Sequence, residues 1–401
     1  MAAIKVTDQI YSVGILNPIM RIFDVVMRTD YGTTYNSYVV KGGQKTALIE
    51  TCHKTYFDQY LKNIQEVTEP GQIDYIILNH CEPDHSGALA ELLRVCTNAE
   101  IFVSRAGAIY LKNITSREDL KVHAVKDGEV LDLGGRKLTF ISAPFLHWPD
   151  SMFTYDEQSQ TLFSCDMFGS HYCEPHTFDY NIVYPEKYQL ALRGYYDAIF
   201  GPFKPYVLQG MEKIENLDIL RLCTSHGPIL TSGCLMESVM EQYRVWSQPA
   251  PKEKRSVPIF YCSAYGNTGK LAGAIAEGVR EVLMDADCQT YDVNDHDLSY
   301  LQGLLNASDA FAVGSPTINQ DAVAPIWNLL SHVDAINNKK RPVLVFGSYG
   351  WSGEAVPNLT ARLTGLKSAV FGEGLKVTFV PSEEDLKKAK ELGKAFAQSL
   401  A

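Results

Sequence analysis

The sequence at residues 79–87 reads NHCEPDHSG, which sets two histidines, a glutamate and an aspartate within six positions, directly after the apolar run IDYIIL. The H-x-E-x-D-H spacing covers His80, Glu82, Asp84 and His85. On an irregular loop, residues two positions apart can turn toward one point, and imidazole and carboxylate groups are common metal ligands. The stretch therefore predicts a metal site, and one loop of this composition can hold two ions.

The flanking sequence places this loop at the end of a strand. TALIET at residues 46–51 and IDYIILN at residues 73–79 predict buried strands, and apolar residues between them recur at helical spacing. Ser86 and Gly87 predict an N-cap and the start of a helix before Leu89. This is the order of an α/β fold, in which functional groups gather at the carboxyl ends of the strands.

Two hairpins are predicted further along. GEVLDLGGRKLTFISAP turns at Gly134 and Gly135, and SMFTYDEQSQTLFSCD turns at DEQSQ. Strands therefore outnumber helices in this part of the chain, and we predict a two-sheet sandwich with outer helices rather than a single open sheet.

Two metal ions need more ligands than one loop supplies, and three further residues each follow an apolar run. His147 lies in FLHWPDS, Asp166 ends TLFSCD, and His226 follows LRLCTS. If Asp166 bridges, each metal receives two histidines and one terminal carboxylate, a nitrogen and oxygen mixture that suits non-haem iron. A zinc hydrolase of similar layout would prefer a histidine at position 82. Glutamate there favours redox chemistry over hydrolysis.

Other polar residues surround the predicted site. His171 and His176, in GSHYCEPHTF, have no strand to direct them, so a structural role is expected first. Cys81 lies inside the cluster, but its spacing directs it away from the metals, and we expect it to pack in the core. Tyrosines among apolar residues are usually core residues as well. The candidates for lining the metal pocket are Trp148, His171, Tyr195 and Tyr196.

A seam divides the chain into two halves. WSQPAPKEKRSVP, residues 246–258, combines prolines with a run of charges. We place the boundary near residue 252 and predict two domains, residues 1–250 and residues 254–401. Most histidines precede the seam, whereas the second half alternates apolar strands with amphipathic helices.

The second half begins with a predicted anion cradle. Residues 257–279, VPIFYCSAYGNTGKLAGAIAEGV, read as an apolar strand, a loop of small polar residues and an amphipathic helix. Backbone N–H groups of such a loop and of the helix N-terminus converge where a phosphate binds. Neither a Walker loop nor a G-x-G-x-x-G motif is present, which disfavours nucleoside triphosphates and dinucleotides. The candidate phosphate-binding residues are Ser263, Ala264, Tyr265, Gly266, Asn267 and Thr268.

Two later segments occupy corresponding places, DAFAVGSPTINQ at residues 309–320 and RPVLVFGSYGWSGEA at residues 341–355. A mononucleotide held on the first loop would have its ring between them, with Tyr349 or Trp351 as a stacking face. FMN fits better than a charged nucleotide, because the cradle offers little positive charge beyond Lys270. The candidate ring-binding residues are Ser315, Pro316, Thr317, Ile318, Asn319, Ser348, Tyr349, Gly350, Trp351, Ser352 and Gly353.

The composition narrows the classes of partner. The chain has 36 Lys and Arg against 47 Asp and Glu, and its net charge of -11 argues against a nucleic acid or an anionic membrane as the main partner. We find no signal-peptide pattern and no apolar run of about 18 residues, so a cytoplasmic protein without a membrane span is expected. The nine cysteines contain no C-x-x-C pair, so we expect no disulfide framework and a reducing compartment.

Taken together, H-x-E-x-D-H at 80–85, LHWPDSM at 146–152, Asp166, SHG at 225–227 and the loops SAYGNT, GSPT and FGSYGWSGE resemble the flavodiiron proteins, also called A-type flavoproteins. The resemblance spans nearly the whole chain. It implies a metallo-β-lactamase-like αββα sandwich with a non-haem diiron site, then a flavodoxin-like doubly wound parallel sheet with FMN. The phosphate loop departs from the threonine-rich flavodoxin pattern at Ala264 and Tyr265.

The resemblance also implies a role for each ligand. His80, Glu82 and His147 would hold one iron and Asp166 would bridge. The other iron would be held by Asp84, His85 and His226, although the ligand at the His85 position is not always engaged in the family.

The reaction implied is reduction of O2 to water or of NO to N2O, with electrons passing from FMN to the irons. The family's head-to-tail homodimer, or a dimer of such dimers, brings the FMN of one subunit beside the irons of the other, and Trp148 is a candidate for that junction. We expect a separate electron donor such as rubredoxin, or reduced deazaflavin, because no rubredoxin or flavin-reductase domain follows residue 401.

Two alternatives belong to other classes of protein. One is a dinuclear zinc hydrolase fused to a flavodoxin domain, against which Glu82 argues. The other is an electron carrier with an inactive metal domain, against which the complete ligand set argues.

Overall fold

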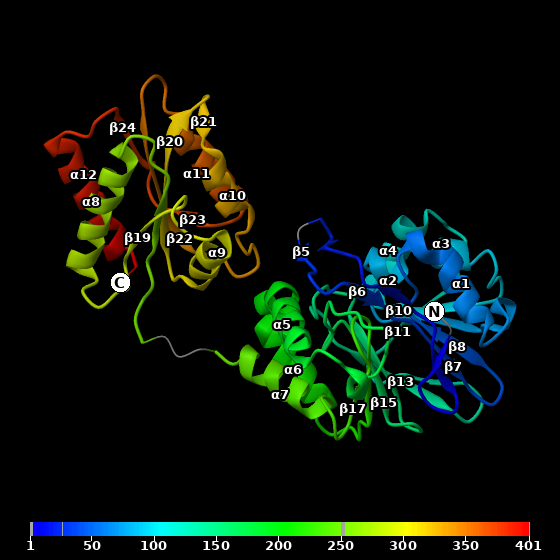
Figure 1. Ribbon diagram of the computed structural model, residues 1–401. Coiled ribbons are helices and arrows are strands. Elements are labelled where there is room, and N and C mark those ends of the chain that lie inside the picture. The colour runs from blue at the N-terminus through cyan, green and yellow to red at the C-terminus, as the bar shows by residue number, and fades with distance from the viewer. Residues whose placement is uncertain (1–2, 26, 250–252, 401) are drawn as a thin grey trace. The chain divides into compact units, whose positions relative to one another are not determined.

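The computed structural model describes residues 3–25, 27–249 and 253–400. The chain divides into two compact units, Met1–Pro249 and Ala250–Ala401 (Figure 1). The boundary expected near residue 252 lies outside the described residues.

The first unit is built on two sheets, as the sequence predicted. The larger sheet has the order β1 (Ile4–Lys5), β2 (Ile10–Ser12), β7 (Tyr38–Lys41), β8 (Thr46–Ile49), β9 (Tyr75–Leu78), β10 (Glu100–Ser104) and β11 (Val122–Val125). The smaller has the order β12 (Val130–Asp132), β13 (Lys137–Ser142), β14 (Met152–Asp156), β15 (Thr161–Cys165), β16 (Arg221–Thr224) and β17 (Leu230–Thr231). Their facing sides share one apolar core, in which Ile77 and Phe102 pack with Phe140 and Phe163.

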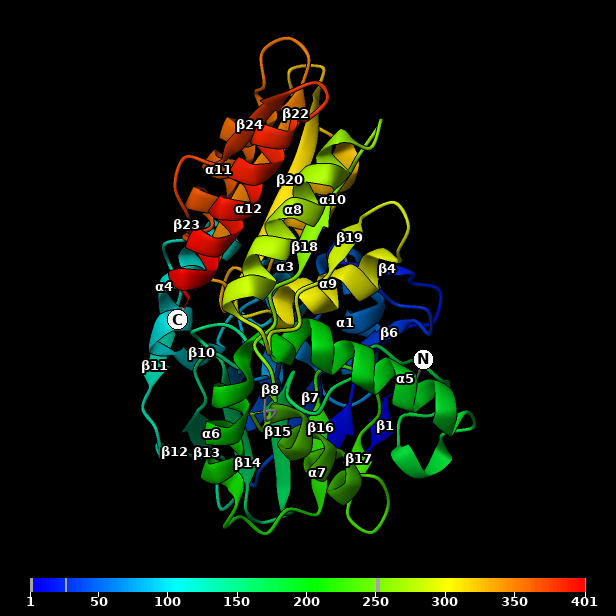
Figure 2. The same cartoon turned by 90° about the vertical axis from the view of Figure 1, so that its left-hand side faces the viewer.

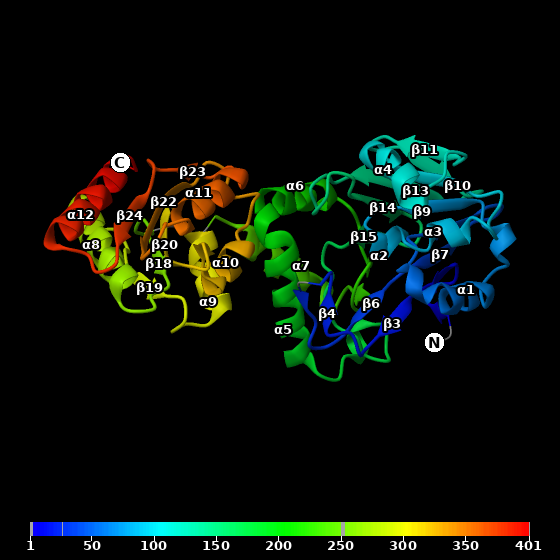
Figure 3. The same ribbon diagram turned by 90° about the horizontal axis from the view of Figure 1, so that it is seen from above.

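Helices cover the outer face of each sheet (Figure 3). Outside the larger sheet lie α1 (Phe57–Gln65), α3 (Leu89–Leu92) and α4 (Arg105–Thr115), which bury Ile64, Leu92 and Leu111 against it. Outside the smaller sheet lie α5 (Pro185–Tyr195), α6 (Lys204–Ile214) and α7 (Met236–Ser247). The shorter elements are β3 (Ile15–Asn17) with β6 (Thr33–Tyr35), β4 (Ile22–Phe23) with β5 (Met27–Arg28), α2 (Pro83–Ser86), and the single turns η1 (Lys54–Tyr56), η2 (Pro70–Gln72), η3 (Asp179–Asn181), η4 (Tyr196–Phe200) and η5 (Gly201–Phe203).

The predicted strands, both hairpins and the intervening helix α1 are confirmed, but the prediction for Ser86 is wrong. Ser86 ends the short helix α2 instead of capping the next helix, and its hydroxyl donates to the carbonyl oxygens of Cys81 at 2.8 Å and Glu82 at 3.0 Å. Helix α3 starts after Ala88, which provides no side-chain cap. Pro83 explains the difference, because proline is favoured in the first turn of a helix and starts α2 earlier than the sequence pattern suggested.

The second unit is a doubly wound sheet. Its order is β19 (Thr290–Asp292), β18 (Ile259–Tyr261), β20 (Phe311–Ile318), β22 (Pro342–Tyr349) and β23 (Ala369–Val370), all paired in parallel. In addition, β24 (Leu375–Thr378) pairs with β22, and β21 (Asp321–Ala322) turns back on β20. Helices α8 (Asn267–Val282) and α12 (Glu383–Gln398) pack on one face (Figure 2), and α9 (Leu298–Ala307), α10 (Ala324–Ser331) and α11 (Ala355–Gly365) pack on the other.

No helix among the described residues is both long enough and apolar enough to span a lipid bilayer.

The contact between α8 and α12 depends on glycine. A Cβ atom on Gly278 would lie 2.0 Å from the carbonyl oxygen of Lys390, and one on Gly393 would lie 2.3 Å from that of Ile275. Both are closer than a carbon atom can approach. The two helices therefore pack backbone against backbone at these positions.

We predict that Gly278→Ala lowers the free energy of unfolding of the second unit by about 1–3 kcal/mol, because the added methyl group forces the helices apart. Gly273→Ala is the matched control on the same helix, since a Cβ atom there meets nothing within 4 Å. It should instead stabilise the protein by about 0.5–1 kcal/mol through helix propensity. Urea unfolding followed by circular dichroism measures both, and equal effects of the two substitutions would contradict the prediction.

Candidate metal centre and flavin site

Loops from both sheets of the first unit bring the seven predicted metal ligands together. His80 and Glu82 follow β9, and Asp84 and His85 lie on α2. The smaller sheet contributes the rest, because Asp166 directly follows β15, His226 follows β16, and His147 lies between β13 and β14. All seven side chains are buried or nearly so, with His147 and Glu82 the most accessible at 13% and 15%.

The first set of donor atoms belongs to His80, Glu82 and His147, which we call trio 1. Glu82 Oε2 lies 3.1 Å from His80 Nε2 and 3.2 Å from His147 Nε2. Asp166 Oδ2 lies on the same side, 3.6 Å from His147 Nε2 and 3.9 Å from His80 Nε2. Four donor atoms thus surround one point.

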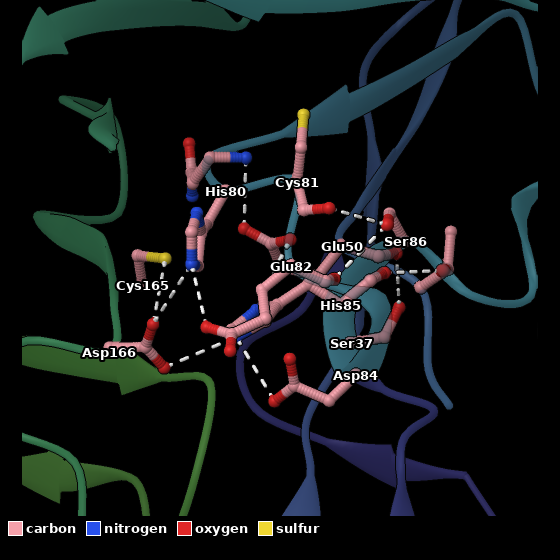
Figure 4. A network of polar contacts seen from close by, with 12 residues as sticks. Ser37, Glu50, His80, Cys81, Glu82, Asp84, His85, Ser86, Cys165 and Asp166 are labelled. Carbon is pink, nitrogen blue, oxygen red and sulfur yellow. Dashed lines mark hydrogen bonds and ion pairs between the residues drawn. The ribbon is translucent and has the colours of Figure 1, made fainter. Parts of the chain in front are cut away.

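The second set belongs to Asp84, His85 and His226, which we call trio 2. Asp84 Oδ2 lies 2.9 Å from His226 Nε2 and 3.3 Å from His85 Nε2. The other oxygen of Asp166, Oδ1, lies 3.2 Å from His85 Nε2 and 3.4 Å from His226 Nε2. The Asp166 carboxylate therefore presents one oxygen to each trio, and Figure 4 shows it facing the side chains of the 80–85 loop.

Opposite charges stabilise each other in this buried cluster. Burial disfavours the charged form of Asp166, but His85, His147 and His226 outweigh it and hold the pKa of this carboxyl well below its usual range. Burial also disfavours the charged form of His80, which by itself would lower the pKa of this imidazole. Hydrogen bonds to Asp150 and Glu82 outweigh that effect and raise the pKa to about 10. The same balance raises the pKa of His85, His147 and His226. Protonated imidazoles and bound metal ions are therefore alternative sources of the positive charge that these carboxylates need.

Three supporting residues, which the sequence analysis missed, orient the histidine rings. His80 Nδ1 lies 3.2 Å from Asp150 Oδ1, and Asp150 also accepts the backbone N–H of Cys81 at 2.7 Å. His226 Nδ1 lies 2.6 Å from the carbonyl oxygen of Thr34. His85 Nδ1 faces Glu50 Oε2 at 3.6 Å. Ligating histidines usually pair their second nitrogen in this way, so a search for carboxylates near the predicted ligands could have found Asp150 in HWPDS.

A cavity of about 20 Å³ opens onto both trios. It is lined by six of the seven candidate ligands together with Phe23, Asp24, His171, Tyr195 and Ile199. A volume of this size accommodates about one water molecule.

The four predicted pocket residues divide into two pairs. His171 and Tyr195 line the cavity, and the Tyr195 hydroxyl donates to Asp166 Oδ1 at 3.1 Å. Tyr196 does not line it, and that prediction is wrong, because Tyr196 is a core residue whose hydroxyl lies 2.8 Å from Ser247 Oγ. Trp148 also lies outside the cavity lining, with its ring edge-on to His80 at 5.1 Å between centroids.

Cys81 and His176 fit the structural roles expected of them. Cys81 is fully buried in the core beneath the larger sheet's helices, and His176 is exposed.

Asp24 is a pocket residue that the sequence analysis missed. It lies between β4 and β5, far in sequence from the predicted ligands. Asp24 is exposed overall, but partial burial of its carboxyl, together with the nearby carboxylate of Glu82, raises the pKa of Asp24 to about 6. Asp24 and Val25 both have positive φ angles, 46° and 57°, a conformation that non-glycine residues rarely adopt outside functional or tightly turned segments.

In the second unit, the predicted flavin residues lie at the carboxyl ends of β18, β20 and β22, on one edge of the sheet. Several of their hydroxyls hold the backbone. Ser263 Oγ accepts the N–H of Gly269 at 3.2 Å, and Ser315 Oγ accepts that of Val323 at 3.0 Å. Thr268 Oγ1 and Ser348 Oγ lie 2.8 Å apart and connect two of the segments. These hydroxyls fix the conformation of the loops that form the site.

The outer part of this edge fits a phosphate and a flat ring. Gly266 has a φ of 79° and starts α8, whose first N–H groups have no partner within the helix. A Cβ atom on Gly266 would meet nothing within 4 Å, so the space in front of the cradle is open. Tyr265 and Trp351 are 90% and 96% exposed, and aromatic surfaces of this kind are what a bound ring would cover. Exposed beside them are Ala264, Ile318, Asn319 and Ser352, while Pro316, Thr317, Tyr349, Gly350 and Gly353 are partly or fully buried.

Each half of the chain matches a known protein family. Residues 33–227 match the ODP family beta lactamase, and residues 259–393 match the flavodoxin family. Over its full 401 residues the chain is 51% identical to the flavo-diiron protein FprA2 of Clostridium acetobutylicum, covering 100% of both chains. It is 33% identical to the anaerobic nitric oxide reductase flavorubredoxin of Vibrio vulnificus, over 92% of this chain and 74% of that protein.

Among solved structures, the rubredoxin oxygen:oxidoreductase of Desulfovibrio gigas superposes with a TM-score of 0.73 at 30% identity, covering 99% of this chain and 98% of that one. The fold, the clustered ligand set and these full-length matches agree with one another. The chain belongs to the flavodiiron protein family, the A-type flavoproteins.

Proposed function

We propose that this protein is an oxidoreductase that reduces O2 to water, NO to N2O, or both, at a diiron centre supplied with electrons by FMN. The observation that carries the proposal is the Asp166 carboxylate, which presents one oxygen to each of two trios of two imidazoles and one carboxylate. The names of two relatives, an oxygen oxidoreductase and a nitric oxide reductase, support both substrates.

The donor set fits two irons. His80, Glu82 and His147 would hold one, Asp84, His85 and His226 the other, and Asp166 would bridge them. Mixed nitrogen and oxygen donors of this kind suit non-haem iron. His85 Nε2 faces both Asp84 and Asp166, which supports its role as a ligand in this chain. When bound, the flavin and the iron pair would supply the electrons that reduce the gas.

The chain's own residues orient the ligands, set the charge of the site and shield it from bulk water. Asp150, Glu50 and the Thr34 carbonyl fix the histidine rings, so the donor atoms stay aimed at two points. Five of the seven donor residues are at most 6% exposed, so the surrounding core shields most of these groups from bulk water. Tyr195 holds the Asp166 carboxylate in place through its hydrogen bond.

The residue at position 82 separates this proposal from a hydrolase. Glu82 stands where a zinc hydrolase would favour a third imidazole. The complete set of clustered ligands argues against a plain electron carrier with an inactive metal domain.

FMN would bind at the edge formed by the ends of β18, β20 and β22, with its phosphate at residues 263–268 and its ring at residues 315–319 and 348–353.

We further propose domains at residues 1–250 and 254–401, a head-to-tail homodimer or dimer of dimers with Trp148 near the flavin junction, and a separate donor such as rubredoxin or reduced deazaflavin. All nine cysteines are unpaired, which supports a reducing, cytoplasmic location.

The first test measures metal, flavin and turnover on one sample. Elemental analysis and flavin release should give two irons and one FMN per chain, and the reduced protein should consume O2 or NO catalytically with a reduced rubredoxin as donor. Two zinc ions that persist after iron-rich growth, with no gain of activity on iron reconstitution, would refute the proposal and favour the hydrolase.

We predict that Asp150→Asn weakens iron binding about 10–100-fold, because His80 loses the charged partner that fixes its ring. Anaerobic titration of the metal-free protein with ferrous iron measures the change. Asp127→Asn is the control, since Asp127 is an exposed carboxylate of the same unit that pairs with Lys213 at 3.0 Å. Equal affinity of the two variants would show that Asp150 does not support the site.

Iron affinity should also rise with pH. The four histidines have raised pKa values in the metal-free protein, whereas a ligating imidazole must be neutral. Binding therefore releases protons, and a higher pH favours the bound state. We predict an increase of at least about tenfold per pH unit between about pH 6 and about pH 8, measured by the same titration. An affinity that does not change over this range would contradict the prediction.

A further inference from the structure

We propose that His171 is a substrate-contacting residue, whose Nε2–H donates a hydrogen bond to O2 or NO held in the cavity. This inference rests on the proposed function, because the ligand it names is the substrate of that reaction. It assigns a specific contact to a residue that belongs to neither trio.

One ring nitrogen of His171 is buried without a hydrogen-bond partner among the described residues. His171 is 4% exposed and lines the cavity. The unpaired nitrogen is Nε2. Leaving such an atom unpaired in a protein interior costs about 1–3 kcal/mol, and buried polar groups of native proteins nearly always have a partner. A ligand in the cavity would be that partner.

The second observation is that the ring is held firmly. Its Nδ1 lies 2.8 Å from Thr33 Oγ1. Phe23 packs on it at 4.3 Å between ring centroids, and Tyr195 packs edge-on at 4.8 Å. A ring fixed on several sides keeps its free nitrogen in one place, as a substrate-contacting group requires.

The third observation concerns the ring hydrogen. Besides His171, the Thr33 hydroxyl can reach only the carbonyl oxygen of Thr34 within the described residues, at 3.4 Å. The much shorter contact with Nδ1 favours donation of the hydroxyl hydrogen to that nitrogen. A neutral imidazole then carries its own hydrogen on Nε2. The free nitrogen is thus a donor, which suits an oxygen atom that gains negative charge as it is reduced.

The fourth observation is the position between the trios. His171 lines the cavity together with Glu82, a member of trio 1, and the shared Asp166. Its ring also lies 5.2 Å from that of His226, a member of trio 2. His171 is therefore next to both proposed metal positions, where a gas molecule bound between them would lie.

The test compares the iron- and FMN-loaded wild type with His171→Leu and His171→Gln. Leucine is of similar size but cannot donate, whereas the glutamine amide can bring an N–H close to the position of Nε2. We expect leucine to lower turnover about tenfold to a hundredfold and glutamine to restore much of it, with two irons retained in both. His123→Leu is the control, because His123 is partly exposed and pairs with Glu129 away from the cavity.

A second readout does not depend on activity. Substoichiometric NO is added to the ferrous protein, and its infrared N–O stretching frequency is measured in H2O and in D2O. The wild type should show a band that shifts in D2O, and His171→Leu should lose that shift while His171→Gln keeps it. Thr33→Val should alter the band, because it removes the hydroxyl that holds the His171 ring. Thr33→Ser keeps that hydroxyl and should leave the band unchanged.

Two outcomes would overturn the inference. One is a wild-type N–O band and wild-type turnover in His171→Leu with two irons bound. The other is loss of iron from both His171 variants, which would make His171 a support for the metal ligands. Because the infrared readout needs only NO binding, it tests His171 even if the wild type turns over neither gas, the result that would refute the proposed function itself.

Discussion

One carboxylate, Asp166, lies between two sets of imidazole and carboxylate groups, and the arrangement of the first unit follows from keeping it there. An ionised carboxylate that is 1% exposed is stable only if positive charge surrounds it. No lysine or arginine is among the residues that line this cavity, so the charge must come from protonated imidazoles or from metal ions. Protonation of the four histidines is one source of this charge, and their nitrogen atoms are the candidate ligands for the other.

The two-sheet architecture is what brings these groups together. β15 and β16 are parallel neighbours, so Asp166 and His226, which follow them, come out at the same edge. β8 and β9 are also parallel neighbours, so Glu50 and the 79–85 loop emerge together, and Glu50 Oε1 accepts the backbone N–H of Asn79 at 2.9 Å. Neither sheet alone supplies both trios. The site therefore forms only when the two sheets pack, and the apolar core between them indirectly fixes the distance between the proposed metal positions.

The seven candidate ligands could be selected from the sequence because His147, Asp166, His226 and the 80–85 segment each come after an apolar run, and strand ends can be read from local patterns. The pairings that orient their rings could not be predicted. Asp150 is close in sequence to His147, but it pairs with a histidine 70 positions away, and the Thr34 carbonyl pairs with one 192 positions away. No local pattern encodes such pairings. His171 was expected to be structural because no strand precedes it, yet contacts with Thr33, Phe23 and Tyr195 place it in the cavity. For Tyr196, the next residue after the pocket-lining Tyr195, the turn of the helix directs the side chain into the core instead. The prediction that Ser86 caps the next helix was wrong for a local reason, because Pro83 starts the short helix α2, which ends at Ser86.

The two halves differ in how much of their chemistry is carried by side chains. In the metal centre the functional atoms are imidazole nitrogens and carboxylate oxygens, so residue identity alone points to the chemistry. In the second unit the buried hydroxyls of Ser315, Thr268 and Ser348 are engaged with the backbone or with each other, and the groups left for a cofactor are backbone N–H groups and exposed aromatic rings. Backbone groups are common to every residue type. A flavin site of this kind is consequently readable from sequence only as an ordered set of strand ends and small-residue loops, and Ala264 and Tyr265 still contribute the backbone N–H groups that such a site uses.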